Sequence, residues 1–332
     1  MDNPPLVTVI LPIRNEGRYI GKCLDAVLAQ DYPLEKIEIL VVDGLSDDDT
    51  REIVGKRARY YAQVRMLDNP KRFVPSALNL GIQAARGQVI VRVDGHAIIA
   101  RDYVRQCVQT LRDTGADCVG GHMRPKGDTS FAKAVALAYG SPFGLGGGRF
   151  HLANSSGYAD TVYMGAYKRA VLDRVGLFNE TLVRNQDIEF NYRLRKNGGK
   201  IYLSSLIQSK YYPRASLTEL ARQNYRTGYW NIKTISESPG SLSLRHFIPL
   251  LFVLGLAANL ILAIAIPPFS FLFGSILAVY SIGLLVSSLV CVKRNGWQYF
   301  PILLAIFPCL HFSYGIGSIA GLFGGLIKVT HI

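Results

Sequence analysis

The chain of 332 residues carries 37 Lys and Arg against 24 Asp and Glu, for a net charge of +13, and 49% of its residues are hydrophobic. That length suffices for one large domain or two, and the hydrophobic fraction is high for a soluble enzyme. A basic chain favours anionic partners such as lipid headgroups or phosphorylated substrates. Nucleic acid is excluded as a partner because the sequence contains no basic-aromatic module of the kind that reads DNA or RNA. The cysteines are Cys23, Cys107, Cys118, Cys291 and Cys309. Their scattered spacing excludes a disulfide framework and a Cys-x-x-Cys zinc site.

Strand and helix patterns alternate through the first hundred residues. β-Branched runs predict buried strands, and apolar residues with a helical period predict helices between them. Strands are predicted at 6–11, 37–42, 64–67 and 88–93, and helices at 19–30 and 76–85. This alternation predicts an α/β fold with a doubly wound, mostly parallel sheet. The polar first residues lead directly into a strand, so no signal peptide is expected.

Polar residues follow the first three predicted strands. Pro12 is expected to end the ladder of the first strand, and Asn15 and Glu16 then face whatever lies above the sheet. Asp43 ends the second strand before a glycine, where its carboxylate could accept a hydrogen bond from the N–H of a base. Arg72 lies in the loop after the third strand and could assist in binding a diphosphate.

The fourth predicted strand ends at Asp94-Gly95-His96. In open α/β sheets, ligands bind at the carboxyl ends of the strands. Gly95 would let a diphosphate or a metal approach the backbone, and Asp94 and His96 could both reach one divalent cation. The alternative is a polar turn after a strand, and these three residues alone leave it open.

Two later helices carry further polar candidates. Gln186 and Asp187 begin a predicted helix, where a carboxylate is often only a partner of the helix dipole. Gln223 and Arg226 share a face of a predicted helix at 217–233, and the alternative is a solvated helix surface. A stretch at 131–139 is apolar and is expected to form a helix near the membrane.

The residues after 241 predict a membrane domain that follows a domain at 1–240. Three uncharged stretches are each long enough to cross about 30 Å of hydrocarbon. They are 247–266, 269–292 and 299–327. Lys293 and Arg294 lie between the second and third stretches, and cations mark the cytoplasmic side. This predicts a multi-pass protein of the inner (cytoplasmic) membrane, with domain 1–240 in the cytosol and three crossings, although the glycines of the third stretch would also suit a re-entrant bend.

These motifs, in this order, resemble those of family 2 glycosyltransferases of GT-A fold. The first two are Pro12-x-x-Asn15-Glu16 and Asp43-Gly-x-Ser-Asp-Asp-Asp-Thr50, and the next two are Asp94-Gly-His96 and Asn185-Gln-Asp187. The stretch Ser141-Pro-Phe-Gly144 with Gly148-Arg-Phe150, together with the Asp-Gly-His variant, is most similar to the ExoA-type succinoglycan biosynthesis glycosyltransferases. The resemblance covers residues 5–235 by motif and the apolar tail by pattern.

The resemblance implies a role for several residues. Asp43 would bind the uracil of the donor, with the loop from Pro12 to Glu16 nearby. Asp94 would hold the ribose or the metal, and His96 stands where most members have the second Asp of D-x-D, which suits Mn²⁺ better than Mg²⁺. Asp187 takes the place of the catalytic base. The remaining correspondences are on the acceptor or diphosphate side: Gln186 replaces the acid that usually precedes the base, and Gln223 and Arg226 match the start of the Q-x-x-R-W motif, in which Thr227 replaces the Trp.

The implied activity is inverting transfer of a sugar from a nucleotide sugar to a polyprenyl-linked saccharide, with a divalent metal, Mn²⁺ or Mg²⁺, as cofactor. The donor expected is UDP-linked, for example UDP-glucose, and the product an exopolysaccharide or another surface glycan. One alternative is a polyprenyl-phosphate sugar synthase, whose acceptor is the lipid phosphate. The other is a non-catalytic membrane subunit with a transferase-like fold. The sequence assigns neither a linkage nor an oligomeric state.

Overall fold

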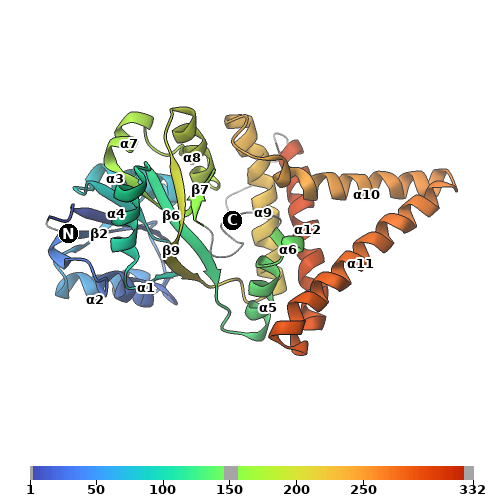
Figure 1. Cartoon of the computed structure of the whole chain (residues 1–332), viewed down its shortest axis with the longest axis horizontal. Coiled ribbons are helices and arrows are strands. Elements are labelled where there is room, and N and C mark those ends of the chain that lie inside the picture. The colour runs from blue at the N-terminus through green and yellow to red at the C-terminus, as the bar shows by residue number, and fades with distance from the viewer. Residues whose placement is uncertain (1–2, 146–155, 325–332) are drawn as a thin grey trace. The chain divides into compact units, whose positions relative to one another are not determined.

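The computed structural model describes residues 3–145 and 156–324 (Figure 1). The sequence features at 148–150 and 325–327 lie outside these ranges. Contacts divide the chain into two units. The sheet unit comprises Met1–Arg124 and Ala153–Tyr211, and the helical unit comprises Pro125–Leu152 and Tyr212–Ile332. Residues 125–145 therefore belong to the helical unit, although they lie between two segments of the sheet unit in the sequence.

Within the described residues, the sheet unit is built on nine strands in the order β3-β2-β1-β4-β8-β6-β9-β5, with β7 paired to β9. The strands are β1 (Val7–Ile13), β2 (Ile37–Asp43), β3 (Val64–Asp68), β4 (Val89–Arg92), β5 (Ala97–Ile99), β6 (Cys118–Pro125), β7 (Gly157–Tyr158), β8 (Tyr163–Lys168) and β9 (Ile201–Tyr211). The helices are α1 (Ile20–Leu28), α2 (Thr50–Tyr60), α3 (Val74–Ala84), α4 (Tyr103–Thr114), α7 (Arg169–Val175) and α8 (Gln186–Lys196).

The first four strands are parallel, as the sequence predicts. Every residue of β1 and β2 is buried, because helices cover both faces of this part of the sheet. The prediction that Pro12 ends the ladder is wrong. β1 continues to Ile13, and Pro12 pairs with Val42 in register. Since Pro12 lacks only an N–H, the ladder loses one donor and the carboxyl ends of β1 and β2 stay level.

Antiparallel strands extend the sheet beyond β4. β8 pairs antiparallel with β4 and with β6, and β9 pairs antiparallel with β5 and β7. The predicted α/β class with C-terminal apolar helices is confirmed. The carboxyl ends of β2, β1 and β4 thus lie side by side at one edge, which is where the polar motifs follow.

A buried carboxylate fixes the start of β4. Glu38 of β2 is 2% exposed. It accepts hydrogen bonds from Thr8 Oγ1 at 2.7 Å, from the Arg86 backbone N–H at 2.9 Å and from Arg86 Nε at 2.8 Å. Thr8 Oγ1 in turn accepts from the Gly87 N–H at 2.9 Å. Burial alone would raise the pKa of Glu38, but the hydrogen bonds from Arg86 and Thr8 hold it below its usual value.

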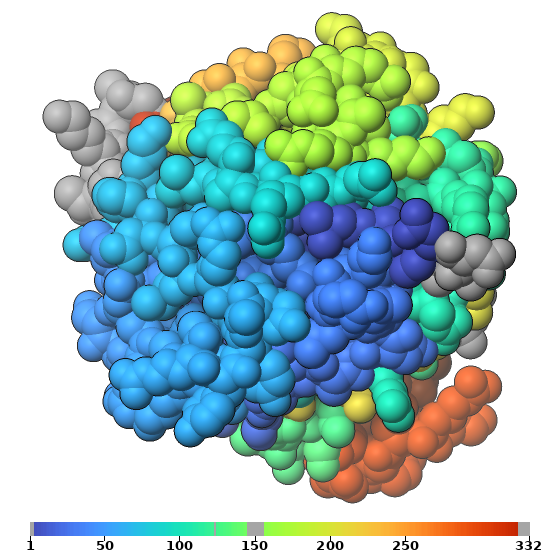
Figure 2. Space-filling view, turned by 90° about the vertical axis from the view of Figure 1, so that its left-hand side faces the viewer, coloured from blue at the N-terminus to red at the C-terminus, as the bar shows by residue number. Residues whose placement is uncertain are grey.

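The segment that leads to α8 is held against α3. Asn79 donates to Phe178 O and to Glu180 Oε1, both at 2.9 Å, and accepts from the Phe178 N–H. Lys71 Nζ lies 2.6 Å from Glu180 Oε2. Figure 2 shows this face of the sheet unit, with the lime-coloured segment bordering the cyan and blue surface of the first part of the chain. These contacts fix where α8 begins relative to β4.

The helical unit contains α5 (Ser130–Tyr139), α6 (Pro142–Leu145), α9 (Leu217–Glu237), α10 (Ile248–Ala265), α11 (Phe269–Asn295) and α12 (Phe300–Phe323). The expected helix at 131–139 is α5. Three helical stretches within residues 3–145 and 156–324 are long and apolar enough to cross a membrane. They are Leu244–Ala265, Phe269–Asn295 and Trp297–Phe323.

Candidate active site

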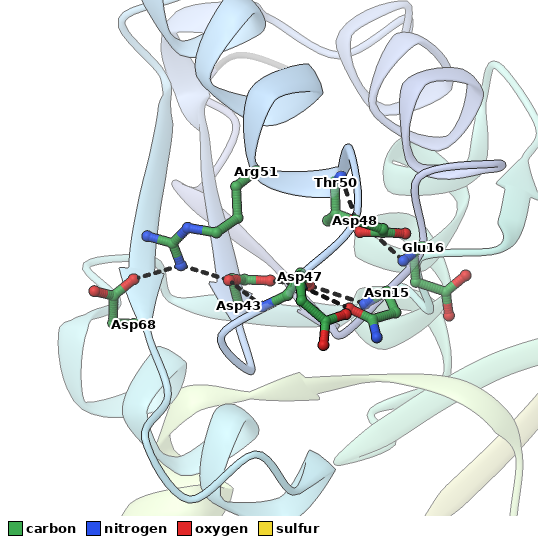
Figure 3. A network of polar contacts seen from close by, with 9 residues as sticks. Asn15, Glu16, Asp43, Asp47, Asp48, Thr50, Arg51 and Asp68 are labelled. Carbon is green, nitrogen blue, oxygen red and sulfur yellow. Dashed lines mark hydrogen bonds and ion pairs between the residues drawn. The ribbon is translucent and has the colours of Figure 1, made fainter.

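The carboxyl end of β2 is a hydrogen-bonded loop around Asp43 (Figure 3). Asp43 is fully buried. Its Oδ1 accepts from Ser46 Oγ at 2.5 Å, and its Oδ2 accepts from the Ser46 N–H at 3.1 Å and from Arg51 Nη1 at 2.5 Å. Arg51 also reaches Asp68 Oδ1 at 2.9 Å. Ser46 and Arg51 therefore fix the orientation of the Asp43 carboxylate at the end of β2.

The carboxyl end of β1 connects this loop with the end of β4. Asn15, in the left-handed region with φ 54°, donates its N–H to Ser46 Oγ at 2.8 Å and accepts from the Asp47 N–H at 3.0 Å. The Glu16 N–H donates to Thr50 Oγ1 at 2.8 Å (Figure 3). Asn15 thus contacts the Asp43 loop, and the Glu16 side chain points on to β4.

Glu16 binds His96. Its Oε1 lies 2.8 Å from His96 Nδ1, and the imidazole packs edge-on against Tyr211, with the ring centroids 5.7 Å apart. Gly95 makes this approach possible, because a Cβ there would lie 2.8 Å from Ile13 Cγ2 and 3.1 Å from Glu16 Cγ. The glycine is needed for the end of β1 to lie against the end of β4.

Arg92, the last residue of β4, joins Asp94 to Asp187. Its Nη2 lies 2.9 Å from Asp94 Oδ1, and its Nη1 lies 3.9 Å from Asp187 Oδ2. The Arg92 and Asp94 side chains are 15% and 16% exposed, and that of Asp187 is 33% exposed. Burial alone would raise the pKa of Asp94, but Arg92 and then His96 hold it below its usual value. Asp94 is therefore anionic at neutral pH, and Asp187 remains open to solvent.

Gln186, the first residue of α8, precedes Asp187 at this site. Gln186 is 5% exposed, and its Oε1 has no hydrogen-bond partner within residues 3–145 and 156–324. Buried polar atoms are nearly always paired in the working state of a protein. This oxygen is therefore a buried acceptor at the start of α8 whose hydrogen-bonding capacity the described residues leave unused.

The remaining candidates are Arg72, in the loop after β3, and Gln223 and Arg226 of the helical unit. The Arg72 side chain is exposed, and its backbone lies in the left-handed region with φ 62°. Gln223 and Arg226 belong to the helical unit, where Gln223 Oε1 accepts from Arg214 Nε at 3.1 Å.

Sequence reasoning missed Arg92 and Arg51. Arg92 interrupts the apolar run Val89-Ile-Val-Arg-Val93, and a charge inside a buried strand was the available signal. Arg51 follows the run Asp47-Asp-Asp-Thr50, where nothing local distinguishes it from a solvated side chain.

A comparison with protein-family models matches residues 8–176 to "Glycosyl transferase family 2". The chain belongs to that family. It is a glycosyltransferase with the GT-A arrangement of strands, which confirms the predicted resemblance.

Two curated relatives match this family 2 transferase along nearly its whole length. A Methanococcus voltae protein named dolichyl N-acetyl-alpha-D-glucosaminyl phosphate 3-beta-D-2,3-diacetamido-2,3-dideoxy-beta-D-glucuronosyltransferase is 29% identical over 97% of both chains. The succinoglycan biosynthesis protein ExoA of Rhizobium meliloti is 28% identical over 93% of this chain and 92% of its own. The chain is therefore similar to a transferase named for a dolichyl-linked substrate and to a protein of succinoglycan biosynthesis.

Two solved structures share the fold. Mannosyltransferase PcManGT from Pyrobaculum calidifontis, in complex with GDP-Man and Mn²⁺, aligns with a TM-score of 0.66 and 21% identity over 97% of this chain and 88% of its own. TarS 1–349 of S. aureus aligns with a TM-score of 0.51 and 17% identity over 96% and 91%. At these identities the likeness shows the fold alone.

Proposed function

We propose that the chain is an inverting, membrane-bound glycosyltransferase that moves a sugar from a nucleotide sugar, UDP-glucose or another UDP-linked sugar, to a saccharide carried on a polyprenyl lipid. The observation that carries the proposal is the ion pairing of both Asp94 and Asp187 with Arg92. Asp94, the acid proposed to meet the donor, and Asp187, the proposed base, would then act in one site at the carboxyl end of β4.

The donor would bind along the ends of β2, β1 and β4. Asp43, with Arg51, would meet the base, whose N–H groups can donate and whose carbonyl oxygens can accept. Asp94 would meet the ribose or the diphosphate. Pro12 and Gly95 would shape the floor of the site, because they keep β1 and β4 level and close together. Arg72 would pair with phosphate oxygens from the loop after β3.

Asp187 would act as the base. The acceptor oxygen attacks the anomeric carbon as the bond from that carbon to the diphosphate oxygen breaks, and the acceptor proton passes to the Asp187 carboxylate. Attack from the face opposite the leaving group inverts the anomeric centre. The buried Gln186 oxygen would accept a hydrogen bond from a second hydroxyl of the acceptor, and Gln223 and Arg226 would act on the acceptor or diphosphate side.

The residues present suit a divalent metal. His96 Nδ1 is held by a carboxylate, which is how metal-binding imidazoles are usually oriented. No group of three or more His, Cys, Asp or Glu side chains that could hold a metal occurs within the described part of the chain. A metal bound jointly with substrate phosphates needs only one or two protein ligands, and Asp94 and His96 would supply them. When bound, the metal would neutralise charge on the leaving diphosphate, and imidazole favours Mn²⁺ over Mg²⁺.

A lipid-linked acceptor is supported by two observations. The apolar helices of the helical unit fit a membrane, and the name of the Methanococcus voltae relative gives it a dolichyl-linked sugar phosphate as acceptor. The cations at the ends of the apolar stretches favour the inner membrane, with the sheet unit in the cytosol. Nucleic acid has no part in the proposal.

The test is sugar transfer by membranes that contain the full chain. Nucleotide sugars are supplied in a panel with Mn²⁺ or Mg²⁺, together with either polyprenyl-linked saccharides or bare polyprenyl phosphate. We expect transfer to the polyprenyl-linked saccharides. Asp187→Asn should lower the rate of transfer at least a hundredfold, while the amount of the protein in the membranes stays the same. Asp173→Asn, at an exposed position of α7, is the matched control and keeps the wild-type rate. Transfer to bare polyprenyl phosphate alone, insensitive to Asp187→Asn because a phosphate needs no base, would reject the proposed acceptor.

A further inference from the structure

Helices α9 and α12 of the helical unit pack in parallel along most of their lengths. Cys309 Sγ contacts Leu217 O, Gly317 packs on the backbone of Tyr225, and Gly321 packs on that of Tyr229. Both members of each pair advance together along the chain, so the helices run in the same direction. Side chains are excluded at the glycines, because a Cβ at Gly317 or Gly321 would meet α9 backbone atoms. The two helices therefore share one orientation and one depth.

α9 cannot lie in hydrocarbon. Glu219, Arg222 and Glu237 are exposed along it, and charged side chains within a bilayer are costly unless they face protein or water. A second helix on α12, α5, likewise exposes Lys133. One side of α12 is therefore covered by helices whose outer surfaces need water.

The other side of α12 is apolar and only partly covered, where Phe312 packs against Phe252 of α10 and Tyr280 of α11. Ile316, Leu322 and Phe323 are 49%, 54% and 60% exposed. In the most apolar part of the stretch that contains α12, 39% is buried inside the protein. The corresponding shares are 6% for the stretch that contains α10 and 11% for α11. A helix with one face on water-exposed protein and the other face apolar and only partly covered is suited to lie in the plane of a membrane surface.

α10 and α11 behave differently. α10 starts against the middle of α12, where Gly315 meets Pro249 and Val253, and then runs away from it (Figure 1). Beyond this crossing Ile261 and Ile264 are 67% and 79% exposed. With 18 residues, α10 is about 27 Å long, near the thickness of the hydrocarbon. α11, with 27 residues or about 40 Å, is long enough for an oblique return.

Charge marks which end of this hairpin meets the cytosolic surface. Arg245 precedes α10, and Lys293 and Arg294 end α11, whereas Pro267 and Pro268 at the tip bring no charge. Cations at both ends and none at the tip follow the positive-inside rule. The same cations suit the anionic headgroups of the leaflet on which α12 would lie.

We infer that α12 does not cross the membrane: α10 and α11 span it as a hairpin, and α12 lies in the cytosolic leaflet with its Ile316, Leu322 and Phe323 side against the acyl chains and its other side against α5 and α9. The chain then crosses twice, and the last turn of α12 is on the same side as the first turn of α10. The inference rests on the proposed membrane location and is independent of the sugar transferred.

The test is the depth of spin labels in the full chain, reconstituted in vesicles of phosphatidylcholine with phosphatidylglycerol. Single cysteines replace the exposed Ala305, Ile316 and Phe323 of α12 in a background without the five native cysteines. The depth of each label is measured from the ratio of its collision rate with oxygen, which concentrates in the bilayer, to its collision rate with a nickel chelate, which stays in water. Ala305 and Phe323 are about 27 Å apart along the helix. We expect all three labels at one shallow depth.

The exposed Leu251 and Ile261 of α10 are the matched controls, and we expect the label at Ile261 to lie deeper than that at Leu251. A deepest label at Ile316, with shallow labels at Ala305 and Phe323, would show a spanning α12 and overturn this inference alone. Controls in α10 without a depth difference would overturn the membrane location, and this inference with it.

Discussion

Arg92 and Asp187 form an ion pair, with Nη1 3.9 Å from Oδ2, although they come from a strand and a helix far apart in the sequence. The same guanidinium donates from Nε to Asp94 Oδ1 at 2.9 Å. Burial alone would lower the pKa of Arg92, but Asp94 and then Asp187 raise it above its usual value. Arg92 therefore stays charged and holds the Asp94 and Asp187 carboxylates at a set separation.

Arg92 can be tested with two substitutions. Arg92→Lys keeps the charge but loses the planar fork, so kcat for sugar transfer should fall at least tenfold in a protein that still folds. Arg92→Met leaves the buried Asp94 carboxylate without its main partner and should lower the free energy of unfolding by about 3–5 kcal/mol. Rates and thermal melting in detergent measure both effects. Arg65, whose pair with Glu38 is longer and whose side chain is 48% exposed, is the control, and Arg65→Lys should change neither. Wild-type kcat for Arg92→Lys would contradict the role.

The Glu16–His96 pair predicts metal selectivity. His96→Asp restores a second carboxylate, so the ratio of activity with Mg²⁺ to that with Mn²⁺ should rise after chelation and re-addition of each metal. Glu16→Gln keeps the imidazole but removes the carboxylate that orients it, and the metal concentration for half activity should rise 10–100-fold. The proposed metal site is wrong if neither variant changes the metal dependence.

The Asp43–Arg51 pair predicts an effect on donor binding. Arg51→Ala leaves a fully buried carboxylate paired only with Ser46, so KM for the nucleotide sugar should rise at least tenfold, and the protein should melt at a lower temperature. Asp68→Asn removes the other partner of Arg51, but Asp68 is 57% exposed, and such pairs contribute about 0–1 kcal/mol. Equal changes in KM for the two variants would show that Asp43 is not specially dependent on Arg51.

The sequence predicts the parallel half of the sheet well, because its strands are buried on both faces. β1 and β2 consist largely of β-branched and apolar residues, and few other structures accommodate such runs. β9 was not predicted, because its buried and exposed positions alternate irregularly and include Ser204, Ser205 and Lys210. Its place in the sheet is decided by pairing with β5 and β7 rather than by its own pattern.

The candidate site divides in the same way. Asp94 and His96 stand at a strand end, so their position follows from the strand. The ion pairs of Arg92 follow from where α8 begins, and that depends on the contact of Asn79 with Phe178 and Glu180. Such contacts between distant segments leave no periodic trace in the sequence. The inferred depth of α12 is a similar case, since length and composition class it with α10 as a candidate span and its packing on α9 and α5 argues against a crossing.

Glu38 predicts how stability depends on pH. Its pKa is below its usual value in the folded protein, so it contributes stability at pH values above the unfolded pKa, about 4.3, and this contribution is lost as the pH falls through the lower folded value. Glu38→Gln should therefore lower the free energy of unfolding by about 1–3 kcal/mol at pH 7, because Thr8 and the Arg86 backbone lose a charged acceptor. The difference from wild type should shrink once both are measured well below pH 4. Glu52→Gln removes an exposed carboxylate paired with Lys56 and serves as the control with little effect at either pH. A deficit of Glu38→Gln that is the same at both pH values would show that the carboxylate acts through its shape and not through its charge.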